Sequence, residues 1–246
     1  MRRVVLFACV LAALVFAAEF FLKPLVVAVA QPRIQAALKT RAVSVQGLEF
    51  KFRPWTFLRG RLSITQLQYS KLKLENIRSR VRLAGTRVLF EDLSGQMLNG
   101  TVKGNASVKL AKEPSYAAAL EFSGLDLAEV IRTFELKEKL QMTGRLGGKL
   151  SIKGKGSKMD VLVGNLSTEH TGGTMIITDT KFLENMARGS GQQLDIIVES
   201  FKNYHYTNGN VSVSLQGGDL VLDTGLEGET GKRDLSVTLH DFSKPK

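Results

Sequence analysis

Residues 143–179 alternate between apolar and polar side chains in short runs separated by glycines. This pattern constrains the fold of the chain more strongly than any other sequence feature. Three short runs, at 145–152, 159–163 and 173–178, place apolar side chains at every second position. Alternate side chains of a strand point to the same face of a sheet, and glycines between runs favour turns. The stretch therefore predicts an antiparallel meander of three strands with one apolar face.

The same pattern continues over most of residues 41–246 and predicts a mainly β domain. Two segments with helical spacing interrupt it, at 126–140 and 180–203. Asp126 stands where the N-cap of the first helix is expected. Residues 204–206 are interpreted as a turn between the second helix and the next strand, and an aromatic site is the alternative.

The N-terminus carries an apolar run over residues 4–22, which Glu19 alone interrupts and which follows a pair of arginines. About 20 apolar residues span a bilayer as a helix, and the arginines would stay on the cytoplasmic side. We expect residues 1–23 to form an uncleaved transmembrane anchor, 24–40 a juxtamembrane helix or linker, and 41–246 the β-rich domain. A cleaved signal peptide is the alternative, because small residues that suit cleavage occur within the run. In both interpretations the remaining residues are exported across the membrane.

The net charge of +11 fits an anionic partner such as a membrane surface. However, basic residues such as Lys71, Lys73 and Arg78 alternate with apolar ones, as on a solvated sheet face. Since no aromatic RNA-binding signature accompanies the charges, no nucleic-acid partner is predicted. The single cysteine, Cys9, lies in the apolar run and allows neither an intramolecular disulfide nor a CxxC metal pair.

The sequence contains no recognisable set of catalytic residues. His170, His205 and His240 stand alone, without an HExxH motif or a nucleophile elbow nearby. No activated serine or cysteine accompanies His240 and its neighbour Asp241. We therefore predict a protein that is not an enzyme, with no cofactor and no metal.

Three stretches carry a family resemblance. After the N-terminal apolar run, LEFKFRP, RGRLSITQL and KLENIRSRVRL resemble the entry region of AsmA-like proteins. The segments LSGQMLNGTVKGNASVKL and MTGRLGGKLSIKGKG resemble the repeated core of that superfamily, to which TamB and YhdP also belong. The segment ESFKNYHYTNGNVSVSL, with the strands after it, resembles the end of YdbH-type members.

This resemblance implies a fold and a function. The implied fold is an N-terminal transmembrane helix followed by a curled antiparallel β-sheet, a groove-like "β-taco", with two short helical insertions. Such proteins are anchored by a single pass in the bacterial inner membrane, with the C-terminal domain in the periplasm. They are thought to conduct phospholipid toward the outer membrane, so the implied role is lipid homeostasis and envelope biogenesis.

In this interpretation one set of alternating apolar residues lines the groove. Each buried methylene gains roughly 0.8 kcal/mol, so lipid tails need a long apolar surface but no specific polar site. The alternative for the same residues is a closed core without a ligand. The predicted lining is Val102, Val108, Leu146, Leu150, Ile152, Val161, Val211, Val213, Leu215, Leu220, Leu222, Leu235 and Val237.

The length of the chain leaves a second role open. Some dozen strands at about 4.8 Å each give a groove of only about 60 Å, which is short for bridging two membranes. We therefore expect self-association or an envelope protein partner. A non-enzymatic scaffold or assembly factor for outer-membrane proteins, offering a sheet edge, is the alternative function.

Overall fold

A computed structural model describes most of the residues that follow the predicted anchor and juxtamembrane segment. The described residues are 43–240 apart from 54–55, 70, 157, 170–171, 180, 182, 185–187, 189–192 and 202. The predicted anchor, 1–23, and juxtamembrane segment, 24–40, lie outside them. Within the described residues, no helix is both long and apolar enough to cross a bilayer.

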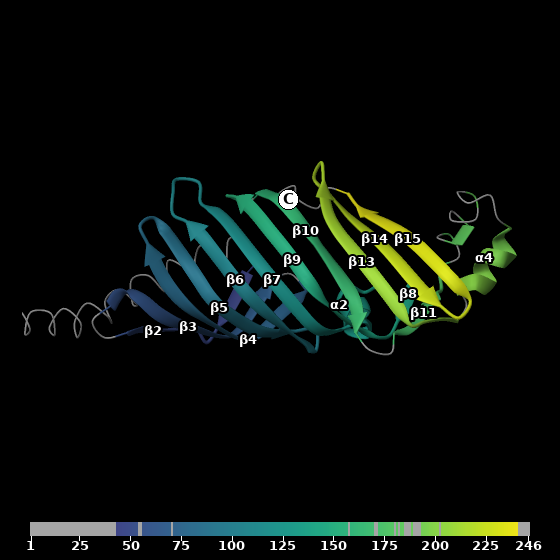
Figure 1. Cartoon of the computed structure of the whole chain (residues 1–246), viewed down its shortest axis with the longest axis horizontal. Helices are drawn as coiled ribbons and strands as arrows, with labels where there is room; N and C mark the ends of the chain where they lie inside the picture. Colours follow the sequence, from purple (N-terminus) through teal and green to yellow (C-terminus); the bar gives the residue numbers. More distant parts are fainter. Residues whose placement is uncertain are drawn as a thin grey trace, which may run out of the picture.

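Twelve strands of the described residues form one open antiparallel sheet (Figure 1). The order is β1-β3-β4-β5-β6-β7-β9-β10-β13-β14-β15, and β2 also pairs with β3. The mainly β, antiparallel prediction is thus confirmed. The strands are β1 (Val43–Gln46), β2 (Glu49–Arg53), β3 (Thr56–Tyr69), β4 (Leu72–Ala84), β5 (Arg87–Met97), β6 (Gly100–Lys109), β7 (Ser115–Asp126), β9 (Arg145–Lys155), β10 (Lys158–Glu169), β13 (Asn208–Gln216), β14 (Asp219–Gly228) and β15 (Gly231–Leu239).

Pairing across the sheet separates an apolar face from a polar one. Directly opposed residues of neighbouring strands share a face. Val102 lies opposite Phe122 on one face, whereas Lys103 opposes Glu121 on the other. The two faces therefore differ in chemistry along the strands, as the alternation predicts.

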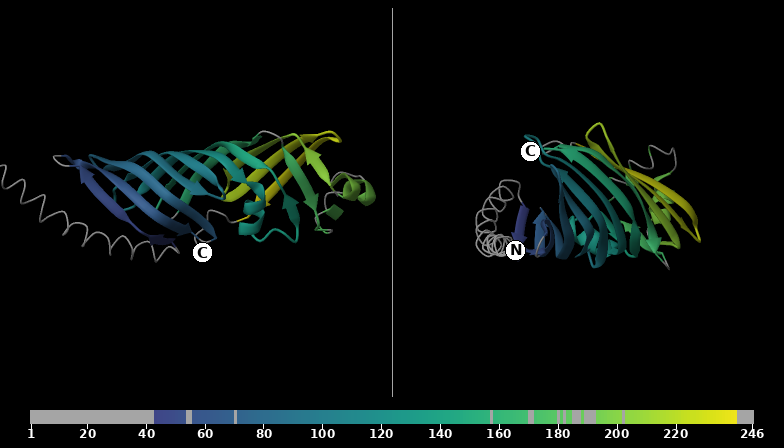
Figure 2. Two further views of the ribbon diagram at one scale, coloured as in Figure 1. Left: turned by 90° about the horizontal axis from the view of Figure 1, so that it is seen from below. Right: turned by 60° about the vertical axis from the view of Figure 1, so that its left-hand side comes forward.

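A second layer covers part of the apolar face, which we call the inner face. It contains a small sheet, ordered β12-β11-β8, and the helix α2, while a second helix, α4, packs against β11 at the end of the molecule (Figures 1 and 2). These elements are α2 (Leu127–Thr133), β8 (Leu140–Met142), β11 (Gly173–Ile177), α4 (Leu194–Phe201) and β12 (Tyr204–Tyr206). Figure 2 shows the long sheet twisting along its length, with α4 beyond the strands at its C-terminal end.

Glycines on the inner face allow neighbouring backbones to approach closely. Gly104 and Gly148 lie within β6 and β9 at φ of +155° and +152°. A Cβ at Gly104 would stand 2.1 Å from the carbonyl oxygen of Ala119, and one at Gly148 would stand 2.2 Å from that of Asn165. Any side chain there would push the strands apart, so these positions favour glycine and help the sheet to coil.

The helix α2 begins where the sequence predicts. The side chain of Asp126 accepts hydrogen bonds from the backbone N–H groups of Ala128 and Glu129, at 2.9 and 3.4 Å. The helix is shorter than the predicted span and ends at Thr133, because Glu135 adopts a positive φ of 58° and turns the backbone toward β8.

Two sequence predictions about the second layer are wrong. The run beginning at Gly173 is a strand, but it does not extend the meander: β10 pairs with β13, and β11 joins the small sheet. Burial explains this choice, since Met175 and Ile177 of β11 lie within the core. Residues 204–206 form the strand β12 and not a turn, because Tyr204 and Tyr206 are both buried there.

Candidate functional site

The inner face divides into two halves along its strands. The half that we call the closed half lies under the second layer, and the half that we call the open half lies toward the other ends of the same strands. The closed half comprises Val102, Phe122, Leu125, Leu146 and Leu226, which form one buried cluster with α2, α4 and the small sheet. The open half comprises Val108, Leu150, Ile152, Leu162, Val213, Leu215, Leu220 and Leu222.

The open half is a cluster made by one sheet alone. Leu162, Val213 and Leu220 form its buried centre, and the partly buried residues around them come from β9, β10, β13 and β14. Among the described residues of this cluster, none belongs to the second layer. Leu150, Leu215 and Leu222 stay half-buried, although they point to the apolar face. The sheet thus gathers a continuous apolar surface that its own described residues leave partly open.

Most of the predicted lining residues share this inner face. Those in the closed half are Val102 and Leu146, and those in the open half are Val108, Leu150, Ile152, Val213, Leu215, Leu220 and Leu222. Val211 and Leu150 pack against both clusters, and Leu235 packs against the closed one. Val237 opposes Leu222 in the strand register, and its side chain lies outside the described part of the molecule.

Val161 is the exception, and its predicted placement is wrong. A break in register between Met159 and Val161 shifts β10 by one residue against β9. Val161 therefore opposes Lys153 on the polar face and is 37% exposed, while Leu162 opposes Ile152 and is buried. A β-bulge of this kind reverses the parity of every residue that follows. Leu162 takes the inner position that the sequence pattern assigned to its neighbour.

Two buried tyrosines hold the second layer in place: Tyr204 bonds to strands of the large sheet, and Tyr206 bonds to the connection between β8 and β9. The hydroxyl of Tyr204 donates to the carbonyl oxygens of Leu226 and Gly231, at 3.2 and 2.5 Å. The hydroxyl of Tyr206 donates to the carbonyl oxygen of Thr143 at 2.5 Å, and burial raises the pKa of Tyr206 to about 12. These bonds fix the cover over the closed half, so the two halves differ structurally and not only in composition.

A comparison with protein families identifies the family of this chain. The model of the YdbH-like family, described as "Intermembrane phospholipid transport protein YdbH", matches residues 13–233. The chain belongs to the YdbH-like family. No curated protein and no solved structure gives a significant match. The resemblance predicted from the sequence is confirmed, and membership of this family implies transport of phospholipid between membranes.

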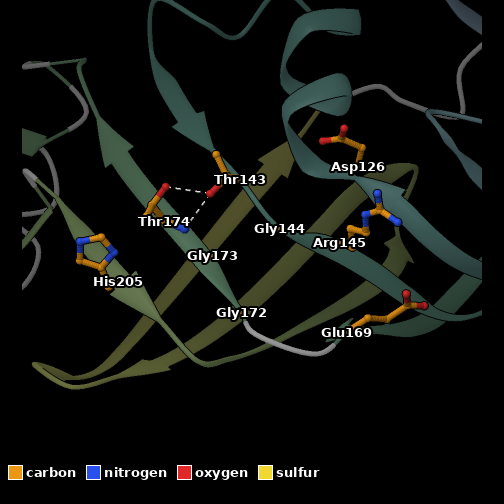
Figure 3. A pocket seen from close by; sticks show the side chains of 9 residues that line it. All are labelled: Asp126, Thr143, Gly144, Arg145, Glu169, Gly172, Gly173, Thr174 and His205. Carbon is orange, nitrogen blue, oxygen red and sulfur yellow. Dashed lines mark hydrogen bonds between the residues drawn. The ribbon is translucent and has the colours of Figure 1, made fainter.

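This YdbH-like protein also has a polar hollow of about 700 Å³ where the two layers meet (Figure 3). It is lined by Asp126, Thr143, Gly144, Arg145, Glu169, Gly172, Gly173, Thr174 and His205. The carboxylate of Glu169 accepts from the N–H of Gly124, at 3.0 and 3.1 Å, and from the hydroxyl of Ser123 at 3.0 Å. Glu169 thus joins the ends of β7 and β10, and the polar walls do not suit an acyl chain.

The inner face contains several residues, besides Leu162, that the sequence pattern did not predict there. Tyr116, Leu120 and Phe122 share one parity in the sequence, but only the register with β9 places them opposite Gly154, Leu150 and Gly148, respectively. The segment that ends at Phe122 carries the signal, because its alternation matches that of 145–152. Among the described residues, no group of three or more His, Cys, Asp or Glu side chains is placed to hold a metal ion.

Proposed function

We propose that the open half of the inner face binds the acyl chains of a phospholipid that the protein carries between membranes. The observation that carries this proposal is the partial exposure of Leu150, Leu215 and Leu222 on the apolar face of an open sheet. Membership of the YdbH-like family supports phospholipid as the ligand.

Energetics favour an apolar occupant of this surface. Leucines that remain half-exposed on an apolar sheet face gain free energy when another apolar group covers them, at roughly 25 cal/mol per Å². A closed core would bury them without help, as the second layer buries Leu226 to 2% exposure. The open half therefore has the same composition as a core but not the same cover.

The headgroup needs no dedicated pocket in this mechanism. The sheet is open, since β1 and β2 at one end and β15 at the other do not pair with each other. A lipid lying along the strands can therefore keep its headgroup in water while its acyl tails lie against the inner face. The polar outer face, with Lys103, Lys149 and Lys153, keeps the same strands soluble.

We also propose that residues 1–23 anchor the protein in a bacterial inner membrane, with the β-rich domain in the periplasm. The apolar run over residues 4–22 supports this proposal. The family assignment favours lipid carriage over the alternative role as an assembly scaffold.

The test compares one charge on the inner face with the same charge on the outer face. The full-length protein is purified from membranes, and its bound phospholipid is measured by native mass spectrometry and lipid extraction. The Leu150→Glu variant should lose bound lipid by about tenfold or more, because a carboxylate against acyl chains loses its hydration. Val161→Glu, on the polar side of the neighbouring strand, should retain the wild-type occupancy.

A folded wild-type protein without lipid would overturn the proposal, as would equal occupancy in the two variants. Circular dichroism establishes that each variant keeps its β content. Should Leu150→Glu fail to fold, Leu222→Gln provides a milder polar change at a second half-buried position of the open half.

A further inference from the structure

Like charges face one another on the outer side of the first strands. Arg59 lies opposite Arg82, and Arg61 lies opposite Arg80, across β3 and β4. Lys51 of β2 opposes Arg61 from the other side. Directly opposed like charges destabilise a sheet, so this arrangement costs stability unless an anion accompanies it.

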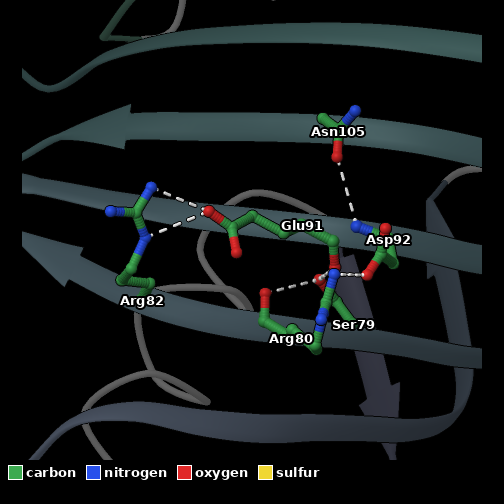
Figure 4. A network of polar contacts seen from close by, with 6 residues as sticks. All are labelled: Ser79, Arg80, Arg82, Glu91, Asp92 and Asn105. Atoms are coloured by element: carbon green, nitrogen blue, oxygen red, sulfur yellow. Dashed lines mark hydrogen bonds and ion pairs between the residues drawn. The ribbon is translucent and has the colours of Figure 1, made fainter.

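Acidic neighbours compensate only part of this charge (Figure 4). Arg82 donates to one carboxylate oxygen of Glu91 from Nε at 3.0 Å and from Nη2 at 2.8 Å. Arg80 forms an ion pair with Asp92, whose backbone N–H donates to Asn105 at 3.2 Å. Within the part of the molecule that the structure describes, Arg59 and Arg61 are exposed and have no acidic partner.

The arginines surround a hollow of about 260 Å³. Its lining includes Arg59, Arg61, Arg80 and Arg82 together with Glu91. Guanidinium groups present several N–H donors in a planar fork that matches phosphate oxygens, often in bidentate fashion. These side chains therefore have the chemistry that suits a phosphate-rich surface. We call this set the basic patch, and it comprises Lys51, Arg59, Arg61, Arg78, Arg80 and Arg82.

The charge is concentrated at one end of the sheet. Positions 49–97 carry ten Lys and Arg against four Asp and Glu, a net of +6, whereas positions 208–239 carry two against five, a net of −3. The basic end is also the end that follows the apolar run over residues 4–22 in the sequence. A membrane that holds this run raises the local concentration of lipid phosphates near the basic strands.

We propose that the basic patch docks on the surface of an anionic phospholipid bilayer, with the arginine hollow receiving lipid phosphate. Docking would hold the outer face of β2–β5 against the bilayer, and so place the first strands of the groove beside the lipid source. This inference rests on the charges of the outer face, and not on whether the inner face binds acyl chains. Such attraction weakens as salt rises.

Trp55, the only tryptophan, provides the readout, because it falls between β2 and β3 in the sequence. The full-length protein is reconstituted into vesicles of phosphatidylcholine, either alone or with a third of phosphatidylglycerol, all with brominated acyl chains that quench tryptophan fluorescence. We expect stronger quenching in the anionic vesicles, reduced by high salt. The double variant R59Q/R61Q should weaken this docking roughly tenfold.

The matched control is K149Q/K153Q, which removes two cations from the outer face of β9 and should leave the quenching near the wild-type level. Equal quenching in neutral and anionic vesicles would overturn the proposal, as would quenching that R59Q/R61Q leaves unchanged. Analytical ultracentrifugation tests a second copy as the occupant: self-association lost in R59Q/R61Q, without any lipid dependence, would also overturn it. A separate measurement of bound lipid tests whether the open half binds acyl chains, and so distinguishes failure of that proposal from failure of the docking proposal.

Discussion

The closed and open halves of the inner face belong to the same strands and share one alternation, yet they end in different states. On β14, Leu226 lies under the second layer and is 2% exposed, whereas Leu222 stays half-buried toward the other end. Met175 of β11 completes the closed cluster at 0% exposure. The comparison teaches that alternation decides which face is apolar, while a separate segment decides whether that face becomes a core or a surface.

The strongest test of this difference is a matched pair of substitutions on β14. Leu226→Ala should destabilise the fold by about 2–5 kcal/mol, because it leaves a cavity in a packed cluster. Leu222→Ala should cost less than about 1.5 kcal/mol, since its surroundings are only partly packed. Urea unfolding measures both changes. Equal losses would mean that the open half is packed as tightly as the closed one.

Tyr206 belongs to the closed cluster, and its hydroxyl donates to the carbonyl oxygen of Thr143, between β8 and β9. Tyr206→Phe leaves that carbonyl without its partner and should cost about 1–2 kcal/mol. Tyr116→Phe is the control, because the Tyr116 hydroxyl donates to the carbonyl of Lys158 at the exposed end of the open half, at 3.2 Å. We expect a smaller loss for the control, again by urea unfolding.

The same tyrosine predicts a dependence of stability on alkaline pH. Burial raises the pKa of Tyr206 to about 12, above the value of 10.0 for a free side chain. The neutral phenol is therefore favoured in the folded state, and its contribution is fully present below about pH 10. It is lost as the pH rises toward 12. The free energy of unfolding, measured across this pH window, should fall less in the Tyr206→Phe variant than in the wild type. An equal fall in both would mean that other titrating groups cause the loss of stability.

The smallest expected effect concerns the edge of the cover. Asp126→Ala removes the side chain that caps α2 and should cost about 1 kcal/mol, while Asp126→Asn should retain most of the stability. Thermal unfolding followed by circular dichroism measures both. Equal losses in the two variants would show that the carboxylate charge, and not the cap, stabilises the helix.

Much of the fold was predictable from the sequence because the long strands repeat a simple pattern. Glycine spacing and alternation predicted an antiparallel sheet of some dozen strands and placed residues such as Val102 and Leu220 on its apolar face. The bulge between Met159 and Val161 was not predictable, because an extra residue in one strand is defined only against its partner. The small sheet was not predicted for a related reason. The sequence of β11 alternates like that of any strand, and its pairing with β8 and β12 follows from its burial in the core.

The pairing of β10 with β13 has a consequence for how the protein folds. Most neighbours in the large sheet are consecutive in sequence and can form as local hairpins. At β10 and β13, by contrast, the N–H of Gly209 donates to the hydroxyl of Thr168, 41 positions away. Closing such a loop costs conformational entropy before it gains contacts. The intervening segment carries most of the second layer, so its compaction brings β10 and β13 closer together before they pair. Formation of the second layer and completion of the large sheet are therefore coupled.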